Sequence, residues 1–165
     1  MGKRYSPWDR FYQKINMIFN GVAASSMIPF AIVFLQIRNG EVSPLINDDS
    51  GIVKILLIIL SLAILVVSNL SSPKLIAPVR KEPTIDKKVR LYLIQKIKQY
   101  AIVESSAIVA LIGFFLLKQQ IFSFIYVGIL FLFSMYRPTF SRVAKEIGES
   151  EEDIVKWSLN DNIEG

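Results

Sequence analysis

The side chain best placed to do chemistry is Glu104, an acid inside a long apolar stretch. An ionisable group within a membrane helix is costly, so it usually has a function or a specific partner. Only Lys118-Gln119-Gln120 separates this stretch from the next apolar one, which predicts an antiparallel hairpin. In that hairpin Glu104 faces Ser134, and Arg137 lies one helical turn beyond, about 4.5 Å along the axis. We therefore predict an ion pair between Glu104 and Arg137.

Other polar residues fall at a comparable depth of the predicted membrane segments. The predicted intramembrane polar cluster consists of Glu104, Arg137, Ser134, Asn20, Asn16 and Asn69. Two interpretations remain open: interhelical hydrogen bonds that hold the helices together, or a site for a proton or an ion. The serine pairs Ser25-Ser26 and Ser105-Ser106 are small enough to let helices approach closely.

The composition argues against most enzymatic chemistry. The sequence contains no cysteine and no histidine, which removes disulfides, histidine-ligated metals and the usual general base near neutral pH. No Gly-x-Ser-x-Gly element or phosphate-binding glycine loop is present. We expect no catalytic residues, no metal site and no cofactor.

Four apolar segments must position these side chains: residues 15–37, 52–70, 101–117 and 121–136. The chain is 52% hydrophobic, and the segments lack the polar face of a helix in a soluble bundle. A bilayer core of about 30 Å needs about 20 helical residues. The first two segments meet that length, and the last two are marginal. The sequence predicts an all-α, four-helix transmembrane bundle over residues 15–136.

Positive charge alternates strongly between the segments that connect these spans. Sixteen of the nineteen lysines and arginines precede the first span, lie between spans two and three, or follow the fourth. Only Arg38, Lys54 and Lys118 fall on the other side. This bias predicts that both the 1–14 segment and the 137–165 tail are cytoplasmic. The basic stretch between spans two and three is expected to face anionic lipid headgroups rather than nucleic acid: Arg80, Lys81, Lys87, Lys88, Arg90, Lys96 and Lys98.

The connecting segments carry their own signals. Pro73, Pro78 and Pro83 predict an extended cytoplasmic strap over residues 71–83. One helix is then expected over residues 86–117, its first half an amphipathic extension near the headgroups. Asp49 or Ser50 is expected to cap the second span, and a short helix to run over residues 150–159.

The second half of the chain carries a family resemblance. Tyr100-x-Ile-x-Glu104-Ser-x-Ala-Ile108, a short apolar hairpin, Arg137-Pro138-Thr139 and an acidic helix start together resemble small four-span inner-membrane proteins of Bacteroidota. The resemblance implies a bacterial inner membrane and this topology, and it implies no activity.

These features predict a non-enzymatic integral membrane protein that acts as an accessory or scaffold subunit of a larger membrane complex, with lipid and other subunits or itself as partners. An alternative is a small oligomeric proton or ion conductor that uses Glu104. A membrane-surface tether working through residues 74–98 also stays open. An intramembrane enzyme lacks a catalytic pair.

Overall fold

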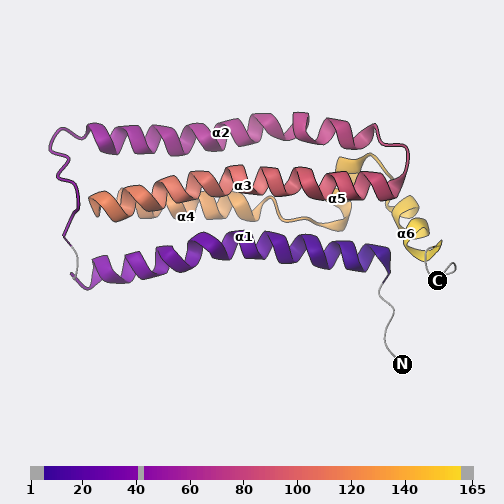
Figure 1. Cartoon of the computed structure of the whole chain (residues 1–165), viewed down its shortest axis with the longest axis horizontal. Coiled ribbons are helices and arrows are strands. Elements are labelled where there is room, and N and C mark those ends of the chain that lie inside the picture. The colour runs from indigo at the N-terminus through magenta and orange to yellow at the C-terminus, as the bar shows by residue number, and fades with distance from the viewer. Residues whose placement is uncertain (1–5, 41–42, 161–165) are drawn as a thin grey trace, which may run out of the picture.

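The computed structural model describes residues 6–40 and 43–160, and these form six helices. In Figure 1, α1, α2 and α3 run side by side, and α4 lies along α3. The start of α1 and the short helices α5 and α6 lie at the same end of the stack (Figure 1). The elements are α1 (Pro7–Arg38), α2 (Ile52–Arg80), α3 (Ile85–Leu117), α4 (Ile121–Ser134), α5 (Phe140–Ile147) and α6 (Glu151–Asn160).

Within the described residues, α1, α2 and α3 are each long and apolar enough to cross a membrane. The fourth apolar helix, α4, has only 14 residues and spans about 21 Å. The predicted all-α class is thus confirmed, together with three helices of membrane-crossing length and composition. The fourth crossing and the side on which the termini lie stay predictions.

Much of the surface of the stack is apolar. Only 11% of the apolar window of α1 and 17% of that of α2 are buried within the protein, against 50% for α3. Isoleucine, leucine, valine and phenylalanine side chains dominate the exposed positions, whereas Ser26, Ser61 and Ser106 are buried. A soluble bundle exposes mainly polar side chains, so this surface fits contact with lipid tails.

The central helix α3 packs closely because its inward positions are small. Ala107, Ala110 and Gly113 are buried along it. A Cβ atom on Gly113 would lie 2.4 Å from Cε1 of Phe122 on α4, so the Phe122 ring packs against α3 more closely than any larger residue at position 113 permits. Small residues at helix interfaces are typical of membrane bundles, where van der Waals packing drives association.

Serine hydroxyls also link the helices. The Ser106 hydroxyl on α3 donates to the Ser61 carbonyl on α2 at 2.7 Å, and the Ser61 hydroxyl lies 3.0 Å from the Ser106 carbonyl. On the other side of the stack, the Ser26 hydroxyl of α1 and the Tyr126 hydroxyl of α4 lie 2.9 Å apart. The small polar pairs predicted to permit close approach therefore each supply a contact between helices.

The predicted extended strap over residues 71–83 is wrong, because α2 continues as a helix through Arg80. Pro73 and Pro78 lie inside the helix on its exposed side, while Ile76 and Val79 are buried on the opposite side. Each proline removes one backbone hydrogen bond. Burial of the two aliphatic side chains in the cluster formed with α3 and α5 offsets that loss.

Three further boundaries can be compared with the sequence predictions. Helix α3 begins at Ile85, one residue before the predicted start, and α6 matches the predicted short helix closely. Helix α5 was not predicted. The N-terminus of α2 is held mainly by Asp48, whose Oδ2 accepts from the Lys54 amide at 2.8 Å. The Ser50 hydroxyl is 3.4 Å from the Ile52 amide, and no hydrogen bond to Asp49 occurs among the described residues.

Candidate functional site

Glu104 lies where α1 meets α3 and is only 7% exposed. Its Oε1 accepts a hydrogen bond from the Ser25 hydroxyl of α1 at 2.8 Å, and that hydroxyl is also 2.7 Å from the Val22 carbonyl. Glu104 is 13 residues before the end of α3, about 20 Å along the helix axis. The acid is therefore deep in the apolar part of the stack.

The predicted ion pair between Glu104 and Arg137 does not form among the described residues. Helix α4 ends at Ser134, so Arg137 leaves the helical path that would have carried it past Glu104. Arg137 is exposed instead. The hairpin prediction also omitted α1, and α1 supplies the hydroxyl that Glu104 accepts from.

The rest of the predicted polar cluster does not assemble into one layer. The Ser134 hydroxyl donates to Phe131 in its own helix, and the Asn16 side chain donates to Tyr12 in its own helix. Asn20 is exposed. Asn69 does make a contact between elements, because its side-chain oxygen accepts from the hydroxyl of Tyr136.

A different polar cluster, centred on Lys96 and Glu146, joins α3 to α5. The ammonium of Lys96 lies 2.7 Å from Oε2 of Glu146, and the Tyr92 hydroxyl donates to the same oxygen at 2.7 Å. Lys96 is 1% exposed and also donates to Gln99, whose amide donates to Ser72 of α2 at 2.9 Å. We call Tyr92, Lys96, Gln99, Ser72 and Glu146 the α5 clamp.

The α5 clamp lies near the edge of the apolar region rather than within it. Lys96 is 21 residues before the end of α3, about 32 Å along the axis, which exceeds the roughly 30 Å of a bilayer core. Burial lowers the pKa of the Lys96 ammonium, and the adjacent Glu146 carboxylate opposes that shift. Burial, together with the same carboxylate, raises the pKa of Tyr92. Glu146 thus offsets the cost of burying a lysine.

Two more cations from the predicted basic stretch bind α5 or the residues that directly follow it. Lys88 pairs with Glu149 at 2.5 Å, and Arg80 donates to the carbonyls of Glu146 and Lys145 at 3.0 and 3.3 Å. Cations at the carboxyl end of a helix also interact favourably with its dipole. The prediction that the whole stretch faces lipid headgroups is therefore wrong for Lys88 and Lys96. The exposed members are Arg80, Lys81, Lys87, Arg90 and Lys98.

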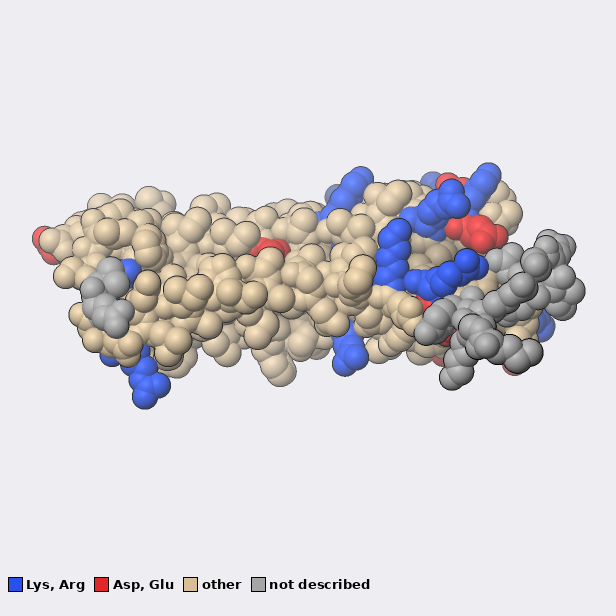
Figure 2. All heavy atoms as spheres, turned by 60° about the horizontal axis from the view of Figure 1, so that its bottom comes forward, with Lys and Arg blue, Asp and Glu red and all other residues tan. Residues whose placement is uncertain are grey.

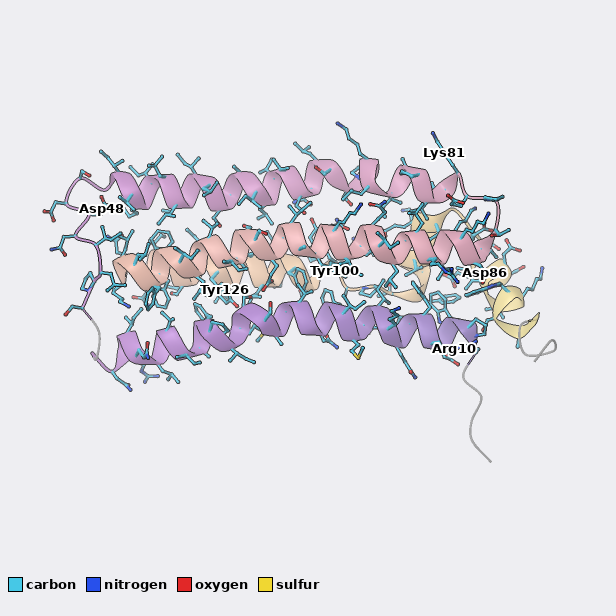
Figure 3. All side chains as sticks on the ribbon, in the orientation of Figure 1. Arg10, Asp48, Lys81, Asp86, Tyr100 and Tyr126 are labelled. Carbon is cyan, nitrogen blue, oxygen red and sulfur yellow. The ribbon has the colours of Figure 1, made fainter. Side chains whose placement is uncertain are left out.

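A groove of about 290 Å³ lies between the start of α1, the start of α3 and α6. Figure 2 shows lysine and arginine side chains gathering toward one end of the molecule, and Figure 3 shows Arg10, Lys81 and Asp86 at the end that carries α6. The Trp157 ring of α6 closes the groove and donates to Asp86 at 3.2 Å. Its basic and apolar lining side chains include Arg10, Lys14, Arg90, Phe11, Leu93 and Trp157.

The sequence did contain a signal for α5, the helix that carries Glu146. Thr139 is followed by Phe140, Val143, Ala144 and Ile147 at helical spacing, and then by Gly148 with a positive φ of 74°. An N-cap residue, an apolar stripe and a terminal glycine together predict a helix. The same pattern does not indicate that Glu146 contacts Lys96, because that contact depends on how α5 packs on α3.

These features define an all-α protein with three helices that could span a membrane and a polar helical end. A comparison with protein-family models gives no match, and searches of curated proteins and of solved structures also give none.

Proposed function

We propose that this chain is a non-enzymatic integral membrane protein of a bacterial inner membrane, and that it serves as an accessory or scaffold subunit of a larger membrane complex. The observation that carries this proposal is the α5 clamp. It fixes α5 on α3, which runs without interruption from the clamp into the apolar stack. A partner that binds this end is thereby held in a defined position relative to the membrane helices.

The groove beside α6 supports the proposal by offering a docking surface. Three basic residues, Arg10, Lys14 and Arg90, line it together with aromatic and aliphatic side chains. On α6 itself, Val155 and Leu159 are 47% and 59% exposed, so this end presents apolar surface as well. We propose that the groove receives a partner segment with acidic and apolar side chains, because cationic rims and aromatic anchors favour such a ligand.

Site-specific crosslinking in native membranes tests this function. A photoreactive residue in place of Leu93, which lines the groove, is expected to capture a partner subunit at defined stoichiometry. The same residue in place of Val66, on the exposed face of α2, serves as the control for random capture. Recovery of the chain only as an isolated monomer after mild-detergent extraction, with no adduct at Leu93, would contradict the proposal.

Reversing the charge of exposed groove residues tests partner binding without disturbing the core of the protein. Arg90→Glu and Lys14→Glu are expected to reduce co-purification of the partner, because both side chains are exposed and line the groove. Lys74→Glu changes the charge equally at an exposed position of α2 outside the groove, and it should leave co-purification unchanged.

A specific observation also favours a second candidate function, proton or ion conduction through Glu104. The acid is buried and, among the described residues, has a serine hydroxyl but no cation as its partner. Glu104→Gln should then abolish flux in proteoliposomes while the thermal unfolding temperature stays close to wild type. Absence of flux above that of empty vesicles in the wild-type protein would eliminate this candidate.

A further inference from the structure

A second cavity, of about 410 Å³, lies at the opposite end of the stack, where α1 ends and α3 turns into α4. Phe34 and Ile37 of α1 and Phe114 of α3 form its apolar wall. Arg38, Lys118 and Gln120 supply polar groups from two different elements. The cavity is remote from the groove beside α6, and neither proposed function uses it.

Lys118 is unusual in both its backbone and its side chain. Its φ of 55° is the only positive φ of a non-glycine residue in the described part of the chain. The position follows the last residue of α3, where glycine is the residue most often found. A lysine there carries a conformational cost that glycine would avoid.

The ammonium of Lys118 lies 4.3 Å above the ring of Phe115, and it is buried with no hydrogen-bond acceptor among the described residues. A buried charged donor without an acceptor is costly. Arg38, the other cation of the cavity, is exposed and forms no ion pair with a described residue. Two cations that line one cavity, one from the end of α1 and one from the turn after α3, favour an anionic ligand.

The surroundings of the cavity indicate what carries the anion. Leu35 and Phe115, which adjoin the lining residues Phe34 and Phe114 in the sequence, are 55% and 40% exposed, as suits contact with lipid tails. We propose that this cavity binds the anionic headgroup of a single phospholipid from the adjacent leaflet. Arg38 and Lys118 contact the phosphate, and the acyl chains lie along the exposed apolar residues of α1 and α3.

Lipid titration of the purified full-length protein in detergent tests this inference. Native mass spectrometry counts bound lipid, and thermal unfolding reports its effect on stability. Dioleoyl phosphatidylglycerol should bind in a saturable manner and raise the unfolding temperature, whereas dioleoyl phosphatidylcholine should bind more weakly. Inorganic phosphate should give no shift, because it lacks the chains that contact the apolar wall. Equal effects of the two lipids, or full stabilisation by phosphate alone, would overturn the proposal.

Two variants locate the site. Lys118→Gly suits the backbone, so it should fold at least as well as wild type without lipid, yet bind phosphatidylglycerol roughly fivefold more weakly, as expected for one lost cation. Arg38→Gln should show a similar loss. Lys54→Gln removes a cation at the same end but outside the cavity, and it should bind as wild type does. An equal loss in Lys54→Gln would show general surface attraction and reject the site.

Discussion

Lys96 of α3 and Glu146 of α5 form an ion pair at 2.7 Å in which the lysine is almost completely buried. Burial of a charge is unfavourable unless a partner and further hydrogen bonds compensate. Tyr92 and Gln99 provide those bonds, so the pair is embedded in a network that joins three helices. The Glu146 carboxylate is therefore the anion on which burial of Lys96 beside α5 depends.

Removing that carboxylate should destabilise the protein markedly. Glu146→Ala leaves Lys96 buried without its anion, and the expected loss is about 3 kcal/mol of unfolding free energy. Denaturant unfolding in detergent measures it. Lys98→Gln, an exposed change on the same helix, is the control and should be close to neutral. The double variant Lys96→Met, Glu146→Leu should recover most of the loss, because it leaves no charge unpaired. A Glu146→Ala protein as stable as wild type would contradict the clamp.

The close approach of α3 and α4 predicts opposite effects for two glycine substitutions. Gly113→Ala forces a Cβ atom against the Phe122 ring and should cost about 1–3 kcal/mol. Gly128→Ala meets nothing within 4 Å, so it should be neutral or stabilise α4 by up to about 1 kcal/mol. Thermal unfolding of both variants in the same detergent provides the comparison. Similar unfolding temperatures for the two variants would show that Gly113 of α3 and Phe122 of α4 do not make the close contact described above.

Adjacent serines on α3 give an internally controlled test of the α2–α3 interface. Ser106→Ala removes the hydroxyl that donates to Ser61 and should cost about 0.6–1.5 kcal/mol. Ser105 is exposed, and among the described residues its hydroxyl bonds to Ala101 of its own helix alone, so Ser105→Ala should change stability little. A larger effect at Ser105 than at Ser106 would mean that α3 presents a different face to α2.

Acid should weaken the start of α2 through Asp48. Hydrogen bonds from the Lys54 backbone amide, and more weakly from Val53, hold the pKa of Asp48 below its usual value. The stabilisation is therefore fully present above the unfolded-state pKa of about 4, and it is lost as the pH falls through the lower folded-state pKa. The protection of the amides in the first turn of α2 against hydrogen exchange, measured relative to an unstructured peptide at the same pH, should fall below about pH 4.

Two asparagine variants check the role of Asp48 in that acid response. In Asp48→Asn, the amides in the first turn of α2 should be less protected from hydrogen exchange already at neutral pH. Their protection should also change less when the pH is lowered. Asp49→Asn, at an exposed neighbouring position, is the control and should behave as wild type does. An unchanged acid response in Asp48→Asn would assign the effect to another group.

The sequence predicted most of the long helices because a membrane imposes a simple requirement, an apolar run of sufficient length. It failed at residues 71–83, where proline was read as a helix breaker. Ser68, Ile76 and Val79 retain helical spacing through that segment, and their burial decides the outcome. The Glu104 partner was predicted from one hairpin alone, whereas the real donor, Ser25, comes from α1. Which helix approaches an acid is a tertiary property that no local pattern specifies.

The shortness of α4 has a consequence for the lipid beside it. At about 21 Å, α4 falls about 9 Å short of a typical hydrocarbon core, while α1 and α2 exceed it. If α4 crosses the membrane, the bilayer on that flank must thin or the stack must tilt, at a cost of a fraction of a kcal/mol per Å. The protein would then impose a lopsided hydrophobic mismatch and gather short-chain lipids, or an equally short neighbouring helix, along one side.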